Sequence, residues 1–115
     1  MPPSTREYFQ HILDECQYLV ANSEGLTESD FLHDPTLQRA FVRSIEIIGE
    51  AVKQVPDFIR DQYAEINWKA ISGMRDRLVH NYFGVDYETL WETVKKRIPE
   101  IEPFIKEILS SLKEE

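Results

Sequence analysis

The sequence predicts an all-α protein, an up-and-down bundle of four main helices with additional short helical segments. Apolar residues recur at intervals of three and four along most of its 115 residues, which is the period of amphipathic helices. No stretch alternates between apolar and polar residues as a half-buried strand does, and short connections separate the helical segments. A chain of this length can bury one core, so we expect a single domain over residues 1–115.

The first helix is predicted over roughly residues 5–22. Ser4 and Glu7 have the spacing of a capping box, in which each side chain bonds a free backbone N–H group. Cys16, the only cysteine, belongs to the apolar positions that follow, so we interpret it as a small buried side chain. After this helix, Thr27 can cap one further helical turn.

The second helix is predicted to begin at Asp34 and Pro35 and to end near Val55, because Pro56 cannot continue it. Gly49 costs about 1 kcal/mol relative to alanine inside a helix, which favours close contact with another helix there. Besides an apolar stripe, the helix carries a polar stripe of Arg39, Arg43, Glu46 and Glu50. This polar stripe is either a solvated face with internal ion pairs or a set of groups that faces a polar cluster on a later helix.

Two helical segments are predicted next, a short one over residues 57–63 and a longer one over residues 68–82. The pair Ser72-Gly73 weakens the longer helix, and Gly84 can end it in the left-handed conformation.

The last helical segment is predicted to begin at Asp86, which can cap it, and to continue to the C-terminus. Pro99 and Pro103 are expected to interrupt or kink this segment, because proline lacks the backbone donor and its ring clashes with the preceding turn.

The composition limits the possible functions. A formal net charge of −8 repels a polyanion at long range, so a nucleic-acid role requires a local basic site or a partner of complementary charge. The N-terminus lacks the pattern of a signal peptide, and no apolar segment approaches the ~20 residues of a membrane span. We therefore expect a soluble, cytoplasmic protein.

Cofactor and metal sites are not indicated. The sequence has no glycine-rich phosphate loop, and its histidines, His11, His33 and His80, lie in different segments. Signatures of a serine or cysteine nucleophile are absent too. We expect neither a metal nor a cofactor.

A polar cluster dominates the end of the helix predicted over residues 68–82; its members are Arg75, Asp76, Arg77, His80, Asn81 and Tyr82. On a helix, Arg77 and His80 share a face, whereas Arg75 and His80 are separated by about 140° around the axis. One copy of the helix therefore cannot aim both Arg75 and His80 at one small target without a bend or a long reach. This geometry favours a dimer.

Two arginines beside a histidine suit phosphate chemistry, because arginine binds phosphate oxygens and histidine moves protons near neutral pH. On RNA the 2′-hydroxyl can serve as the nucleophile, so the reaction needs no metal. The simpler alternative is an exposed helix end, where basic groups are favourable and Asn81 or Gly84 helps termination. By the same reasoning Tyr82 can be a packed aromatic residue.

This cluster resembles the signature of the HEPN superfamily, an arginine followed by a polar residue and then by a histidine after four to six positions. Arg75, Asp76 and His80 match it, and Tyr82 matches the longer pattern of HepT-like toxins. The resemblance extends over residues 39–51 and 67–86, in the expected order.

The resemblance implies a ribonuclease toxin of a toxin–antitoxin pair that acts as a homodimer, with the two motif helices forming one RNA-binding cleft. It implies that Arg75 binds the scissile phosphate, that His80 transfers protons and that Asp76 positions one of them. The implied partner is an MntA-like nucleotidyltransferase antitoxin, which transfers AMP from ATP to Tyr82. Further expected contributors to RNA binding or to the interface are Arg77, Arg39 and Arg43. The alternative is a non-catalytic HEPN module that binds a nucleotide or a nucleotidyltransferase.

Overall fold

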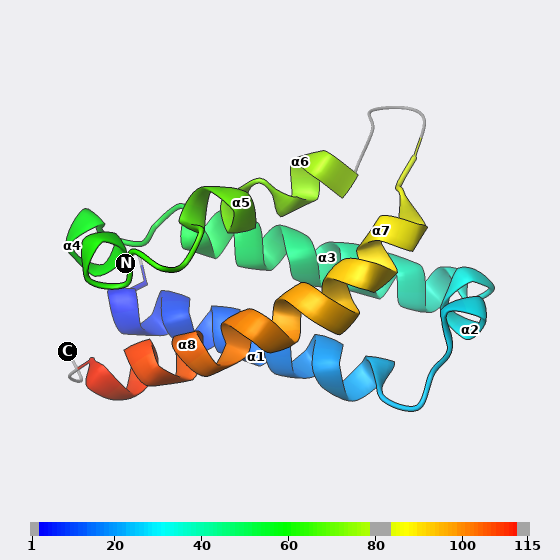
Figure 1. The fold of residues 1–115 in the computed structure, drawn as a ribbon, viewed down its shortest axis with the longest axis horizontal. Coiled ribbons are helices and arrows are strands. Elements are labelled where there is room, and N and C mark those ends of the chain that lie inside the picture. Colours follow the sequence, from blue (N-terminus) through cyan, green and yellow to red (C-terminus); the bar gives the residue numbers. More distant parts are fainter. Residues whose placement is uncertain (1–2, 79–83, 113–115) are drawn as a thin grey trace.

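Four helical rods run alternately up and down in the computed structural model, which describes residues 3–78 and 84–112 (Figure 1). The rods are α1 (Thr5–Ser23), α3 (Pro35–Val52), α5 (Trp68–Ser72) with α6 (Met74–Leu78), and α7 (Tyr87–Glu92) with η2 (Thr93–Arg97) and α8 (Ile98–Ser111). Two short helices, α2 (Glu28–Leu32) and α4 (Asp57–Gln62), lie in the connections. The all-α bundle predicted from the sequence is confirmed.

Local capping explains where the first helices begin. The Ser4 hydroxyl accepts a hydrogen bond from the Glu7 N–H at 3.2 Å, and the Glu7 carboxylate accepts one from the Ser4 N–H at 3.1 Å. Thr27 and Asp30 form a second capping box at the start of α2. The sequence predicted both starts, the first from the spacing of Ser4 and Glu7 and the second from Thr27 as a cap.

The end of α3 differs from the prediction, because the helix stops at Val52 and not near Val55. The side chain of Arg60 takes two backbone carbonyls there, at 2.7 Å from Val52 O and 3.1 Å from Val55 O. Pro56 also disfavours the helical conformation for Val55, the residue before it. Arg60 thus donates to the Val52 carbonyl, whose partner in a longer helix would be Pro56, a residue without an N–H.

The predicted helix over residues 68–82 is wrong as a continuous element, because α5 and α6 are separate helices that meet at Gly73. The Arg77 guanidinium donates to Ala70 O at 2.6 Å, the carbonyl that a continuous helix would offer to the Met74 N–H. Ser72 Oγ also bonds the Lys69 carbonyl, which competes with the backbone. Residues 79–82 of the prediction lie outside the described part.

The two prolines near the C-terminus do not end the last rod. Pro99 lies in the first turn of α8, where a missing N–H is tolerated, and Pro103 lies inside a helix that continues to Ser111. The adjustment precedes Pro99: in η2 the Ile98 N–H donates to Thr93 O, five residues back. The expected interruption is therefore a local π turn.

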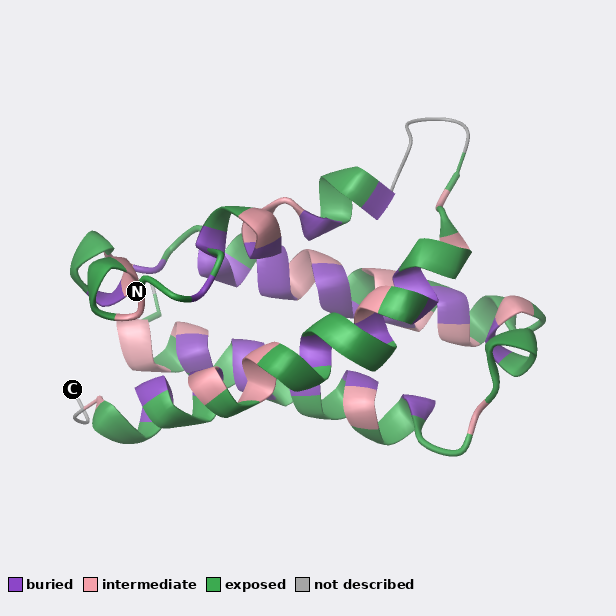
Figure 2. Ribbon diagram, viewed as in Figure 1, coloured by how far each residue is buried: buried purple, intermediate pink, exposed green. Residues whose placement is uncertain are grey.

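The core lies between the rods, with α3 in contact with α1, α2, α5, α6 and α7 (Figure 2). Phe31 stacks between Phe41 and Trp91, with ring centroids 5.3 Å apart in both pairs, and so joins α2 to α3 and α7. Gly49 lies against α5, since a Cβ atom there would be 3.3 Å from Ser72 O. The predicted close helix contact at Gly49 is confirmed. Over the described residues, no helix has the length and hydropathy that a membrane span requires.

Candidate functional site

Arg75 lies on α6 and is held from two sides. Its Nε is 3.7 Å from Glu46 Oε2 on α3, and its Nη1 is 3.5 Å from Asp76 Oδ1. The Arg75 side chain is nevertheless 47% exposed, so part of the guanidinium remains open to a ligand. The structure thus joins one predicted site residue, Arg75, to a second, Asp76, and to a glutamate from another helix.

Each of the two interpretations of the polar stripe on α3 holds for part of it. Glu46 faces Arg75, whereas Glu50 pairs with Lys53 at 3.4 Å on an exposed surface. Arg39 and Arg43 are exposed and form no ion pair within the described residues. Among the described residues, Glu46 is therefore the member of the stripe that pairs with the predicted site residue Arg75.

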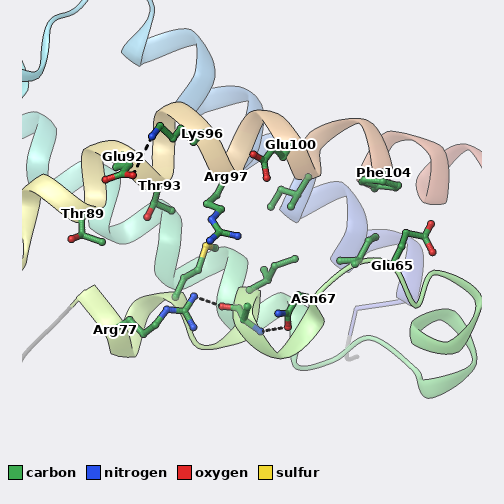
Figure 3. Close-up of a pocket in the computed structure, with 15 residues that line it drawn as sticks. Glu65, Asn67, Arg77, Thr89, Glu92, Thr93, Lys96, Arg97, Glu100 and Phe104 are labelled. Carbon is green, nitrogen blue, oxygen red and sulfur yellow. Dashed lines mark hydrogen bonds and ion pairs between the residues drawn. The ribbon is translucent and has the colours of Figure 1, made fainter.

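Arg77 points away from Arg75. The two residues are two positions apart on α6, which places them about 200° apart around a helix axis. Arg77 lines a groove between α5–α6 on one side and α7, η2 and α8 on the other (Figure 3). The two arginines of the predicted cluster therefore serve different surfaces of the same helix.

His80 and Tyr82, the predicted proton-transfer and modification residues, lie outside the described part of the structure. A backbone hydrogen bond joins the chain before them to the chain after them, since the Asp86 N–H donates to Leu78 O at 2.8 Å. Gly84 has a φ of 92°, the left-handed conformation that the sequence predicts for it. The roles of His80 and Tyr82 remain predictions.

The groove has a volume of about 510 Å³, within the range of small-ligand sites. Its apolar lining consists mainly of Ile66, Ile71, Met74, Ile101 and Phe104. Lys96 and Arg97 also line it, although no sequence pattern singles them out. Their only sequence signal is an exposed position on a helix with an apolar stripe, which most surface cations share.

Metal-binding and thiol chemistry gain no support from the described residues. Across residues 3–78 and 84–112, no three histidine, cysteine, aspartate or glutamate side chains come together as metal ligands would. Cys16 is buried, and the loss of hydration raises the pKa of its thiol to about 12, with Glu102 and Glu15 adding to the shift. Its thiolate is therefore not available near neutral pH.

Comparisons with known proteins give the family. The family model for "Ribonuclease HepT-like" matches residues 10–108. "Putative RNase TTE0752" of Caldanaerobacter subterraneus subsp. tengcongensis is 53% identical, over 94% of this chain and 96% of that protein. "Probable ribonuclease HepT" of Thermococcus cleftensis is 39% identical, over 88% of this chain and 92% of that protein. No solved structure matches significantly. The chain belongs to the HepT-like ribonuclease family of the HEPN superfamily, as its arginine–histidine cluster predicted.

Proposed function

We propose that this protein is the toxin of a toxin–antitoxin pair, a homodimeric RNA endonuclease of the cytoplasm that cleaves without a metal. Membership of a ribonuclease family supports RNA as the substrate. The finer parts of the proposal are the dimer, the catalytic residues, the metal independence and the control by a partner enzyme. Each of them has its own physical argument.

The observation that carries the proposal is that Arg75 is held by two carboxylates and remains partly exposed. Its guanidinium is oriented by Glu46 through Nε and by Asp76 through Nη1. Arginine has five N–H donors, and within the described residues Nη2 and the second Nη1 hydrogen have no partner, so they can bind phosphate oxygens. A guanidinium that is held in place and half exposed suits the stabilisation of charge on a phosphate during transfer.

His80 is assigned the proton transfers. A base removes the proton of the 2′-hydroxyl, the 2′-oxygen attacks phosphorus, and the bond to the 5′-oxygen breaks as that oxygen receives a proton. The products are a 2′,3′-cyclic phosphate and a 5′-hydroxyl. Histidine suits both proton steps because its ordinary pKa lies near neutrality.

The homodimer is supported by the angular argument from the sequence. On a regular helix that continued from α6 to His80, Arg75 and His80 would be about 140° apart, so that one copy would not aim both at one phosphate. Two motif helices that meet across an interface bring an arginine and a histidine together, and a dimer has two copies of His80 for the two proton transfers. Arg77, Arg39 and Arg43 would then bind RNA beyond the cleft or pair across the interface.

Regulation is assigned to Tyr82. An MntA-like nucleotidyltransferase antitoxin would transfer AMP from ATP to its hydroxyl, with release of pyrophosphate. The modification adds a bulky group and a negative phosphodiester two residues from His80. It therefore blocks the cleft and repels RNA phosphates, as other charge-adding modifications do.

The first test is cleavage of RNA in EDTA. The purified protein should cleave tRNA or mRNA and leave 2′,3′-cyclic phosphate ends, and His80→Ala should abolish the cleavage. His11→Ala is the matched control, because His11 is an exposed histidine on α1. Cleavage by His80→Ala at the rate of the His11→Ala control would refute the mechanism, and absence of any cleavage would favour a non-catalytic HEPN module.

The second test is adenylylation. Incubation with the partner enzyme and ATP should add one or more AMP units to the intact mass, and Tyr82→Phe should remove the gain. Tyr18→Phe serves as the control, since Tyr18 is an exposed tyrosine of α1. A mass gain that persists in Tyr82→Phe would reject Tyr82 as the acceptor.

A further inference from the structure

Two arginines line the groove from opposite walls. Arg77 extends from α6, and Arg97 extends from the end of η2 (Figure 3). Arg77 donates to the Ala70 carbonyl at 2.6 Å, which fixes its side chain without neutralising its charge. Arg97 forms no ion pair or hydrogen bond within the described residues, although the chain has 21 acidic and 13 basic residues.

Two unneutralised guanidiniums in one groove constitute an anion site, because each offers a planar set of donors that matches phosphate oxygens. None of the carboxylates that line the groove forms an ion pair with Arg77 or Arg97. Glu92 pairs with Lys96 at 3.2 Å on its rim, and Glu65 lies at the far end, near Phe104. Glu100, the remaining carboxylate, lies one turn beyond Arg97 and forms no ion pair with it.

The floor of the groove is apolar. Ile71 and Met74 come from the α5–α6 wall, and Ile101 and the half-buried ring of Phe104 come from α8. A flat aromatic base can lie on such a surface, since bases stack on aromatic and apolar side chains without sequence preference. Cations in the middle and an apolar surface beside them match the two halves of a nucleotide.

From these features we infer that the groove between α5–α6 and η2–α8 binds a nucleotide unit of single-stranded RNA. Its phosphate lies between Arg77 and Arg97, and its base lies on the apolar floor. The choice of RNA as the source rests on the proposed function, whereas the site itself rests on the groove. Because Arg77 and Arg75 point in different directions from α6, this site is separate from the one at Arg75, and it would hold the strand beyond the cleaved bond.

The test measures binding without cleavage. A fully 2′-O-methylated single-stranded RNA, which lacks the nucleophilic hydroxyl, is titrated by fluorescence anisotropy at several salt concentrations. Arg97→Ala should weaken binding about tenfold, the loss expected for a charged hydrogen bond to phosphate. It should also lower the slope of log affinity against log salt by about 0.7, the value for one phosphate contact on a single strand. Arg97→Lys should restore part of the affinity, because lysine keeps the charge without the fork of donors.

Lys106→Ala is the matched control, because Lys106 is an exposed cation of α8 outside the groove. Its ion pair with Glu102 is long, at 3.8 Å, so the control should change affinity by less than about twofold. Parallel calorimetry with AMP distinguishes a free nucleotide from RNA as the source. Arg97-dependent binding of either ligand supports the site.

Equal affinities of Arg97→Ala and Lys106→Ala for both ligands would overturn the inference, as would the absence of binding by the unaltered protein. Light scattering measures the oligomeric state of each variant independently. If Arg97→Ala dissociates the protein while RNA affinity per assembled dimer is unchanged, the groove is a subunit interface and the inference is wrong. RNA binding that depends on Arg97 in a protein that cleaves no RNA would refute the proposed function and leave the nucleotide site standing.

Discussion

The contact between Glu46 and Arg75 predicts that a residue outside the arginine–histidine motif supports RNA cleavage. The substitution Glu46→Gln keeps the size of the side chain and removes the charge that faces Arg75 Nε at 3.7 Å. Within the described part of the chain, Arg75 would then retain one ion pair, with its exposed sequence neighbour Asp76 at 3.5 Å. Its guanidinium would then sample more orientations than the one that leaves Nη2 free for phosphate.

The size of the expected loss of activity follows from the exposure of the Arg75–Glu46 ion pair. The side chains of Arg75 and Glu46 are 47% and 34% exposed, so solvent screens their interaction. Pairs of this kind contribute about 0.2–1 kcal/mol, which corresponds to a loss of up to about fivefold in kcat/KM. The loss should fall mainly on kcat, because the oriented guanidinium acts on charge that develops in the transition state.

The assay compares initial rates on one RNA substrate for Glu46→Gln and for Glu50→Gln. Glu50 lies one turn further along α3 and pairs with Lys53, so it reports the effect of removing a negative charge from the same helix. Urea unfolding of both variants separates loss of activity from loss of stability. Equal rates for the two variants, or a faster Glu46→Gln enzyme, would refute the positioning role, since a faster enzyme would mean that Glu46 competes with phosphate for Arg75.

Two further predictions concern stability. Arg60→Met should lower the free energy of unfolding by about 1.5–3 kcal/mol, because the carbonyls of Val52 and Val55 lose a charged donor; urea unfolding beside Arg39→Met, an exposed arginine of α3, measures it. A smaller loss than in Arg39→Met would contradict this role of Arg60 at the end of α3. Cys16 should resist thiol reagents in the folded protein. Above pH 9.0 the thiol ionises in the unfolded chain, while its pKa in the folded protein stays at about 12. The free energy of unfolding should therefore fall by at most about 1.4 kcal/mol per pH unit, and Cys16→Ala should reduce that slope.

The elements that could be predicted from sequence are those fixed by near neighbours. The capping box at Ser4 and Glu7 spans three residues, and the first turn at Pro35 needs only the proline itself. Where the prediction was wrong, a side chain from elsewhere took a backbone carbonyl. Arg60 does so at the end of α3, and Arg77 does so at the break between α5 and α6. Hydrophobic periodicity does not register such contacts, because it describes faces of helices and not the reach of long polar side chains.

In the candidate site, too, some features could be predicted from the sequence and others depend on the packing of the helices. The spacing of Glu46 on its polar stripe indicated a face that could meet a later cluster, but only the packing of α6 against α3 selects Glu46 over Glu50. Arg97 carries no comparable signal. Its position in the groove depends on how the last rod crosses α5 and α6, which is a property of the folded bundle. The motif residues His80 and Tyr82 were identified by pattern, and their roles stay predictions.

The net charge of −8 opposes the approach of RNA at long range, but it has less effect on contacts at short range. At about 0.1 M salt, fields decay over about 10 Å, so the acidic exterior slows the approach of RNA more than it weakens bound contacts. Binding strength depends on the guanidiniums that touch phosphate, and α6 presents Arg75 on one side and Arg77, opposite Arg97, on the other. An acidic protein with a few oriented arginines therefore binds RNA only where those arginines can reach phosphate, which disfavours loose contacts elsewhere on its surface.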